Sequence, residues 1–116
     1  MTTRKDFRTA WLQFLLRSSG GYGYELRRAL ELRGLKLDPA VLYRSLRDME
    51  STGLIVSRWV GSEEGPSRRV YDVTPAGEAE LGRIAGSLRQ TRTAHDAFLA
   101  AYDAAAPPDA PLPEPR

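Results

Sequence analysis

The 116-residue sequence predicts a mainly α-helical fold with one small β-hairpin. Three observations predict it. Apolar residues recur at helical spacing in three consecutive segments, two short runs of branched and aromatic residues follow them, and a long helical pattern comes last. The order helix, helix, helix, hairpin is typical of a winged helix-turn-helix. We therefore expect a winged helix-turn-helix that continues into a long C-terminal helix.

The first two helices are predicted from apolar spacing and from the glycines that separate them. The first covers residues 7–17 and the second covers residues 23–33. The adjacent glycines at positions 20 and 21 are expected to interrupt the helix between these two segments, and Gly34 is expected to end the second helix. One face of the first helix carries Phe7, Trp11, Phe14 and Leu15.

The third helix has a clear predicted start. Asp38 offers an N-cap side chain, and Pro39 suits the first helical position, where no amide donor is needed. The helix is predicted to continue to about Thr52 and to end at Gly53. Its expected buried stripe consists of Leu42, Leu46 and Met49.

The hairpin is predicted from two strands, residues 54–60 and 69–73, rich in branched and aromatic side chains. The segment between them, residues 61–67, is rich in Gly, Pro and Ser and is expected to form the loop. Trp59 ends the first strand. For it we favour packing against the domain core over stacking on a nucleic-acid base.

A long helix is predicted after Thr74 and Pro75, continuing to about Tyr102. Its residues at alternating spacings of three and four form an expected coiled-coil seam: Leu81, Ile84, Leu88, Thr91, His95, Phe98 and Tyr102. At 1.5 Å per residue the helix would be about 40 Å long, so we expect it to pair two chains. The predicted parts are therefore a winged helix-turn-helix domain (1–75), a dimerisation helix (76–103) and a disordered tail rich in Pro and Ala (104–116).

Composition excludes several classes of site. The chain has no cysteine and a single histidine, which excludes disulfide scaffolds, thiolate nucleophiles and zinc sites with Cys ligands. We expect no metal, no cofactor and no membrane segment, and we expect a cytoplasmic protein. The net charge is only +2, but residues 1–75 carry 13 Lys and Arg against 9 Asp and Glu. A polyanion would dock on that part.

Double-stranded DNA is the expected partner, because the third helix resembles a recognition helix. Its exposed side carries two arginines and a tyrosine, which can reach base edges and phosphates, and more cations stand at the base of the hairpin. An ordinary solvated surface remains the alternative for these charges. The expected DNA-binding residues on these grounds are Lys36, Tyr43, Arg44, Arg47, Arg58, Ser67, Arg68 and Arg69.

Five segments stand in a recognisable order: residues 21–26 (GYGYEL), 38–50 (DPAVLYRSLRDME), 53–59 (GLIVSRW), 65–71 (GPSRRVY) and 74–77 (TPAG). Together they resemble the PadR family of transcriptional regulators over roughly residues 11–88. The chain has one long helix after the hairpin, as in the short PadR subfamily.

The resemblance implies roles for several residues. It places Tyr24 at the start of the supporting helix, where we add it to the expected DNA-binding residues, and it makes Tyr43 the family's recognition-helix tyrosine. Arg44 replaces the proline that often follows this tyrosine, which adds a cation at the DNA face. The resemblance also implies a basic wing at Arg68 and Arg69, and a homodimer joined by the last helix.

Some short members of the family bind flat aromatic compounds between their subunits. The candidate effector residues here are Trp11, Phe14, Phe98 and Tyr102. Dimer-core packing is the favoured alternative for all four. His95 on the seam is a candidate pH switch, but a hydrogen bond across the interface is the more common role of such a histidine.

The sequence thus predicts a sequence-specific DNA-binding regulator, a homodimeric repressor that responds to a small aromatic molecule. The alternative is a winged-helix module that binds an acidic protein and no DNA. An enzyme is the weakest reading, because no nucleophile and base pair, metal cluster or phosphate loop is apparent.

Overall fold

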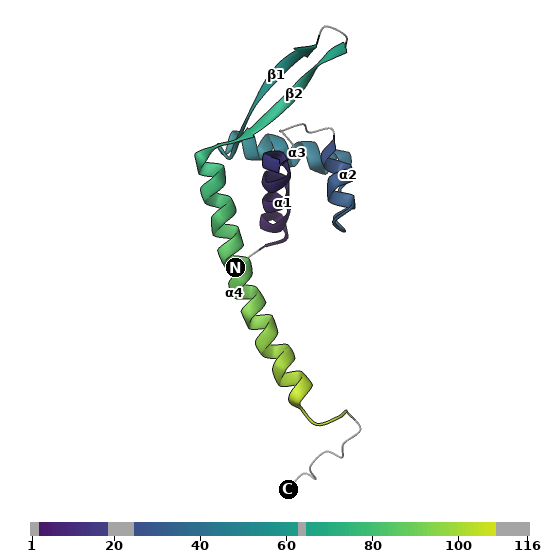
Figure 1. Cartoon of the computed structure of the whole chain (residues 1–116), viewed down its shortest axis with the longest axis vertical. Helices are drawn as coiled ribbons and strands as arrows, with labels where there is room; N and C mark the ends of the chain where they lie inside the picture. The colour runs from purple at the N-terminus through teal and green to yellow at the C-terminus, as the bar shows by residue number, and fades with distance from the viewer. Residues whose placement is uncertain (1–2, 19–24, 63–64, 109–116) are drawn as a thin grey trace.

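The computed structural model describes residues 3–18, 25–62 and 65–108. It is mainly helical with one two-stranded antiparallel hairpin, as the sequence predicts (Figure 1). The elements in chain order are α1 (Arg4–Ser18), α2 (Leu26–Glu31), α3 (Pro39–Ser51), β1 (Ile55–Ser62), β2 (Gly65–Val73) and α4 (Pro75–Ala104). Within the described ranges, no helix is both long enough and apolar enough to span a membrane.

Helix α1 begins three residues earlier than the apolar pattern predicts. The Thr3 hydroxyl accepts a hydrogen bond from the Asp6 amide at 3.0 Å, and the Asp6 carboxylate accepts one from the Thr3 amide at 3.1 Å. This reciprocal capping satisfies amides that the first turn would otherwise leave unpaired. The hydrophobic pattern starts at Phe7 and cannot reveal the polar first turn.

Helix α2 is much shorter than predicted. Its expected first residues, including Tyr24, lie outside the described residues. At its other end the chain turns at residues 32–34, where Gly34 has a φ of +80° and the Leu35 amide donates to the Leu30 carbonyl at 2.9 Å. Gly34 therefore stops the helix as expected. Residues 32 and 33, which were predicted to be helical, belong to the turn before it.

Helix α3 matches its prediction. The Asp38 carboxylate accepts a hydrogen bond from the Ala40 amide at 2.8 Å, and Pro39 is the first helical residue. Gly53, with a φ of +82°, follows the end of the helix. The buried residues of α3 are Leu42, Ser45, Leu46 and Met49.

The β1–β2 hairpin, called the wing below, is longer than predicted. Its register begins with Ile55 opposite Val73 and continues to Ser62 opposite Gly65. The predicted loop of residues 61–67 is therefore wrong, since most of it lies in the strands. Each strand of a two-stranded hairpin has an unpaired edge, where a proline such as Pro66 removes no ladder hydrogen bond. Between the pairs Val60–Arg68 and Ser62–Gly65 the register shifts, because β2 has one more residue than β1 in this stretch.

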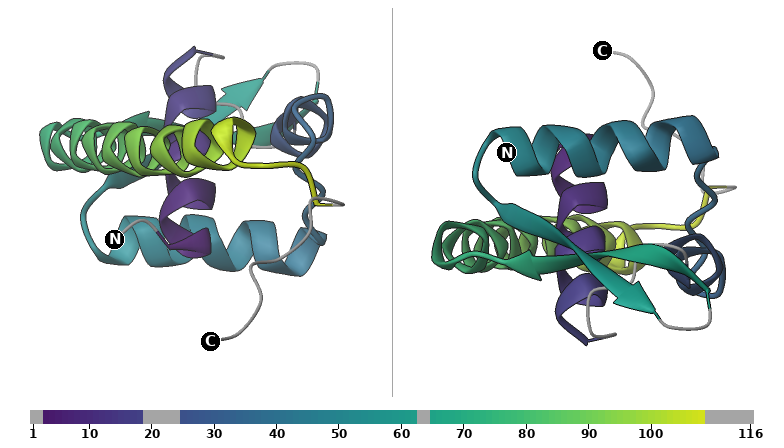
Figure 2. Two further views of the ribbon diagram at one scale, coloured as in Figure 1. Left: turned by 90° about the horizontal axis from the view of Figure 1, so that it is seen from below. Right: turned by 90° about the horizontal axis from the view of Figure 1, so that it is seen from above.

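The hydrophobic core lies where the three N-terminal helices meet the base of the wing. Helix α1 is central to it and packs against α2, α4 and β2, and Figure 2 shows it crossing α4. The core cluster consists of Leu12, Leu15, Leu16, Leu26, Leu30, Leu42, Leu46, Met49, Ile55 and Tyr71.

The first turn of α4 is held firmly to this core. The Thr74 hydroxyl accepts a hydrogen bond from the Gly77 amide at 3.0 Å and donates to the Leu54 carbonyl at 3.1 Å. Gly77 is buried, and a Cβ at this position would overlap the Leu54 carbonyl oxygen. From this base the 30-residue helix, about 45 Å long, extends past the other helices (Figure 1).

Candidate nucleic-acid interface

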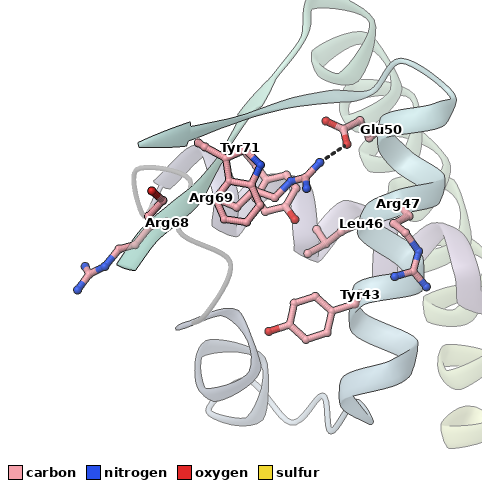
Figure 3. Close-up of a pocket in the computed structure, with 9 residues that line it drawn as sticks. Tyr43, Leu46, Arg47, Glu50, Arg68, Arg69 and Tyr71 are labelled. Atoms are coloured by element: carbon pink, nitrogen blue, oxygen red, sulfur yellow. Dashed lines mark hydrogen bonds and ion pairs between the residues drawn. The ribbon is translucent and has the colours of Figure 1, made fainter. Parts of the chain in front are cut away.

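A cleft of about 470 Å³ lies between α3 and the wing (Figure 3). Helix α3 forms one wall and the inner face of the wing forms the other. The lining residues are Tyr43, Leu46, Arg47, Glu50, Trp59, Ser67, Arg68, Arg69 and Tyr71. Five of the residues that the sequence predicts at a DNA contact are therefore brought together: Tyr43, Arg47, Ser67, Arg68 and Arg69.

Glu50 joins the two walls of the cleft. Its Oε2 accepts a hydrogen bond from Nη2 of Arg69 at 3.2 Å, and its Oε1 accepts a short hydrogen bond from the Ser57 hydroxyl. Arg69 also donates from Nε to the Ser57 oxygen at 3.0 Å. The Ser57 hydrogen bond, assisted by the Arg69 charge, lowers the pKa of Glu50 below its ordinary value despite the opposing effect of burial.

Two aromatic rings flank the Arg69 guanidinium. Its central carbon lies 5.4 Å from the Trp59 ring centroid and 6.0 Å from that of Tyr71. Trp59 is 64% exposed, so the prediction that it packs against the domain core is wrong. The long wing carries position 59 beyond the core, where the register sets it opposite Arg69. Tyr71 is buried at the base of the wing, and this burial raises the pKa of its hydroxyl.

The exposed face of α3 presents Tyr43, Arg44 and Arg47. Tyr43 and Arg47 line the cleft, and Figure 3 shows the Tyr43 ring pointing from α3 into it. Arg44 is exposed on the same helix but does not line the cleft.

The two wing arginines differ in direction. Successive residues of a strand point to opposite faces, and the register sets Arg69 opposite Trp59 but Arg68 opposite Val60. Figure 3 shows the Arg69 guanidinium directed toward Glu50, whereas that of Arg68 points away from it. The two cations of the predicted basic wing, Arg68 and Arg69, therefore lie in different environments.

Two further predicted contacts, Arg58 and Lys36, lie outside the cleft. Arg58 is on the other face of β1 from Trp59, and its Nε lies 3.6 Å from an Asp72 carboxylate oxygen. Lys36 is exposed in the segment before α3. Sequence reasoning missed Glu50, although positions 43, 47 and 50 share one helix face, a spacing that would have placed Glu50 beside the cleft.

A second, apolar groove of about 280 Å³ lies between α1 and α4. It contains two of the candidate effector residues, Trp11 and Phe14, whose ring centroids are 6.1 Å apart. The other two, Phe98 and Tyr102, lie on the exposed end of α4, with their ring centroids 6.2 Å apart. They do not line the groove of their own chain. The groove is lined by Phe7, Ala10, Trp11, Phe14, Leu81 and Leu88.

The predicted seam along α4 changes character with distance from the core. Ile84 is 1% exposed and packs within its own chain, so it has no surface left for a second one. Leu81, Leu88 and Thr91 are half-buried, and the Thr91 hydroxyl donates to the Ser87 carbonyl at 3.1 Å. Residues 92–104 are exposed throughout, including His95.

Comparison with known proteins places the chain in a family. The "Transcriptional regulator PadR-like family" matches residues 12–83, more than half of the chain. Transcriptional regulator Rv3488 of Mycobacterium tuberculosis is 40% identical over 60 residues, which are 52% of this chain and 55% of that protein. The match thus spans only about half the length of this curated relative.

Solved structures agree in fold. A PadR family transcription regulator from hypervirulent Clostridium difficile R20291 is 26% identical, with a TM-score of 0.73 over 80% of this chain and 98% of that chain. A PadR-like transcriptional regulator from Bacillus cereus is 25% identical, with a TM-score of 0.70 over 79% and 90% of the two chains. The chain belongs to the PadR-like family of transcriptional regulators.

Proposed function

We propose that this chain is a sequence-specific repressor that binds double-stranded DNA as a homodimer and releases it in response to a small aromatic effector. The observation that carries the proposal is the cleft between α3 and the wing, which Tyr43 and Arg47 line from α3 and which Ser67 and Arg68 line from the wing. A groove with hydroxyls and cations on both walls suits a sugar-phosphate strand.

In the proposed complex α3 enters the major groove. Arg44 and Arg47 are three residues apart, and so both reach base edges or phosphates, while the Tyr43 hydroxyl donates to a phosphate oxygen. Ser67 and Arg68 bind the backbone beside the wing. Tyr24, Lys36 and Arg58 are proposed as flanking contacts, and Asp72 reduces the contribution of Arg58.

A second copy of the chain is the proposed partner of α4. The last turns of α4 are exposed, with Phe98 67%, Leu99 51% and Tyr102 64% accessible, and the α1/α4 groove is apolar. Burying these surfaces in a dimer would remove them from water. The interface that we propose extends over Leu81, Leu88, Thr91, His95, Phe98 and Tyr102. Two copies of α3 about 34 Å apart would then read a palindromic site.

The proposed effector site combines Trp11 and Phe14 of one protomer with Phe98 and Tyr102 of its partner. Planar dyes provide a direct test, because a ring stacked on Trp11 would quench its fluorescence. Absence of quenching by a panel of planar aromatic compounds would remove the effector from the proposal and leave DNA binding intact.

DNA binding itself is tested by fluorescence anisotropy with a labelled random duplex at low salt. We expect measurable non-specific binding that weakens steeply as salt is added, because bound cations release counterions from the phosphates. The competing function, a module for acidic proteins, is favoured by one observation: the net charge of the chain is only +2, which is modest for a DNA-binding protein. It predicts no binding to any duplex.

A further inference from the structure

Glu50, Ser57 and Arg69 form a hydrogen-bonded cluster between α3 and the wing, called the wing latch below. We propose that Glu50 is a positioning residue that holds Arg69 and thereby fixes the angle of the wing to α3. In this proposal Arg69 helps to fix the position of the wing and does not contact DNA itself, whereas Arg68 makes the phosphate contact. This inference rests on the proposed DNA binding and assigns different roles to two neighbouring arginines.

The wing latch joins three elements of the fold. Glu50 lies in the last turn of α3, Ser57 on β1 and Arg69 on β2. Both carboxylate oxygens of Glu50 are used, one by Ser57 and one by Arg69, and the Arg69 Nε donates to the same serine oxygen. Each member therefore contacts the other two, and a rotation of the wing away from α3 breaks two of the three hydrogen bonds.

The aromatic residues strengthen this arrangement. Trp59 and Tyr71 lie on the same wing face as Arg69, with ring centroids 5.4 and 6.0 Å from its guanidinium. The guanidinium is thus held along the wing surface and directed at Glu50 (Figure 3). A phosphate that took the Nε and Nη2 donors of Arg69 would displace both the Ser57 hydroxyl and the Glu50 carboxylate.

The wing needs such a contact because a two-stranded hairpin is only marginally stable alone. The base of the wing is anchored by Ile55 and Tyr71, which are buried, but its outer part is exposed. Ser67 and Arg68 lie in that outer part, so the prediction that they stand at the base of the hairpin is wrong. A wing already fixed relative to α3 presents them at the correct spacing from Arg47 and avoids the cost of ordering it on binding.

Substitution of Glu50 distinguishes a latch from simple electrostatics, because the two predict opposite signs. Suppose first that Arg69 contacts a phosphate and that Glu50 weakens this contact. Glu50→Gln would then remove a negative charge and free the Arg69 cation, so that DNA binding becomes tighter. The slope of log affinity against log salt concentration, called the salt slope, would become steeper by about 1. For a latch, Glu50→Gln weakens binding by about three- to tenfold and does not steepen the slope.

Asp48→Asn is the matched control. It removes the same charge two residues earlier on α3, at a residue that does not line the cleft, and so measures the general electrostatic effect. Arg69→Lys is the second variant, since it keeps the charge but loses the planar fork that reaches Ser57 and Glu50 together. We expect Arg69→Lys to weaken binding about as much as Glu50→Gln.

A spectroscopic readout follows the wing without DNA. In protein labelled with 5-fluorotryptophan, the 19F resonances of Trp11 and Trp59 report on the α1/α4 groove and on the wing. We expect Glu50→Gln and Arg69→Lys to shift and narrow the Trp59 resonance and to leave that of Trp11 unchanged. Because the pair is partly exposed, the melting temperature should change little, so the variants remain folded.

Two results would overturn the latch: Glu50→Gln binding DNA as tightly as Asp48→Asn or more tightly, or a Trp59 resonance that neither variant moves. If the wild-type chain binds no duplex, the proposed function fails. The 19F spectra then still decide the latch, since they need no DNA.

Discussion

The side-chain amide of Gln13 donates a hydrogen bond to the carbonyl of Gly77 at 3.0 Å, joining α1 to the first turn of α4 across 64 residues of sequence. Gln13 is fully buried, and the Thr74 cap lies beside it. The long helix is thus anchored rigidly to the winged domain, so that its direction is set by contacts within one chain.

Gly77→Ala should destabilise the fold. The added methyl group would overlap the Leu54 carbonyl and crowd Gln13 and Val73, and overpacking of this kind costs about 1–3 kcal/mol. Urea unfolding followed by circular dichroism measures it. Gly82→Ala is the control in the same helix: its Cβ meets nothing within 4 Å, and so we expect a gain of up to about 1 kcal/mol. Equal effects at both positions would contradict the close packing at Gly77.

Asp38→Ala should lower stability by about 0.5–2 kcal/mol, because the Ala40 amide loses its acceptor at the start of α3. Asp38→Ser keeps a capping oxygen and should retain most of the stability. Thermal unfolding of the two variants beside the wild type checks this. An Asp38→Ser variant as unstable as Asp38→Ala would argue against capping as the cause.

Arg68→Ala should weaken binding to every duplex and lower the salt slope by about 1, as expected for one lost phosphate contact. Arg58→Ala is the comparison, because Arg58 lies on the other face of β1 and pairs with Asp72. We expect its effect to be smaller. Anisotropy titrations at several salt concentrations measure both quantities, and a larger loss for Arg58→Ala would refute the proposed contact.

The wing latch should weaken in acid. Its hydrogen bonds lower the pKa of Glu50 in the folded chain below the ordinary value of 4.5. A carboxylate with a lowered folded-state pKa stabilises the fold above the unfolded pKa, and this stabilisation is lost as the pH falls through the lowered value. The difference in unfolding free energy between the wild type and Glu50→Gln should therefore shrink as the pH falls below the ordinary value of 4.5 and through the lowered one. A difference independent of pH would contradict the ionised latch.

Phe98→Glu should dissociate the proposed dimer and leave each chain folded. Phe98 is 67% exposed in the single chain, so the charge costs little there, but an unpaired charge in an apolar interface costs about 3–5 kcal/mol. We expect the dimer dissociation constant to rise by a hundredfold or more, roughly that cost converted to an affinity. Sedimentation equilibrium measures it, with Gln90→Glu, off the predicted seam, as the control. An unchanged dimer would place the interface elsewhere.

Much of the fold was predictable from short-range patterns. The bounds of α3, its buried stripe and its Asp38 cap were predicted correctly, as was the Thr74 start of α4. These features depend on residues within one or two turns of each other, so their cause is visible in the sequence. The exposed positions of Tyr43 and Arg47 follow from the same periodicity, and they led to one wall of the cleft.

The other wall depended on contacts between distant residues. Only strand register decides that Arg69 faces Glu50, 19 residues away, while the Arg68 guanidinium points away from Glu50 (Figure 3). The same register carries Trp59 out of the core, and the packing of α1 on α4 buries Ile84 in its own chain. The sequence by itself determined α3, the capped starts of α3 and α4, and the charge of the exposed face of α3. Only the tertiary structure decided that Arg69 is the wing arginine held by Glu50, because that contact depends on pairing across the wing.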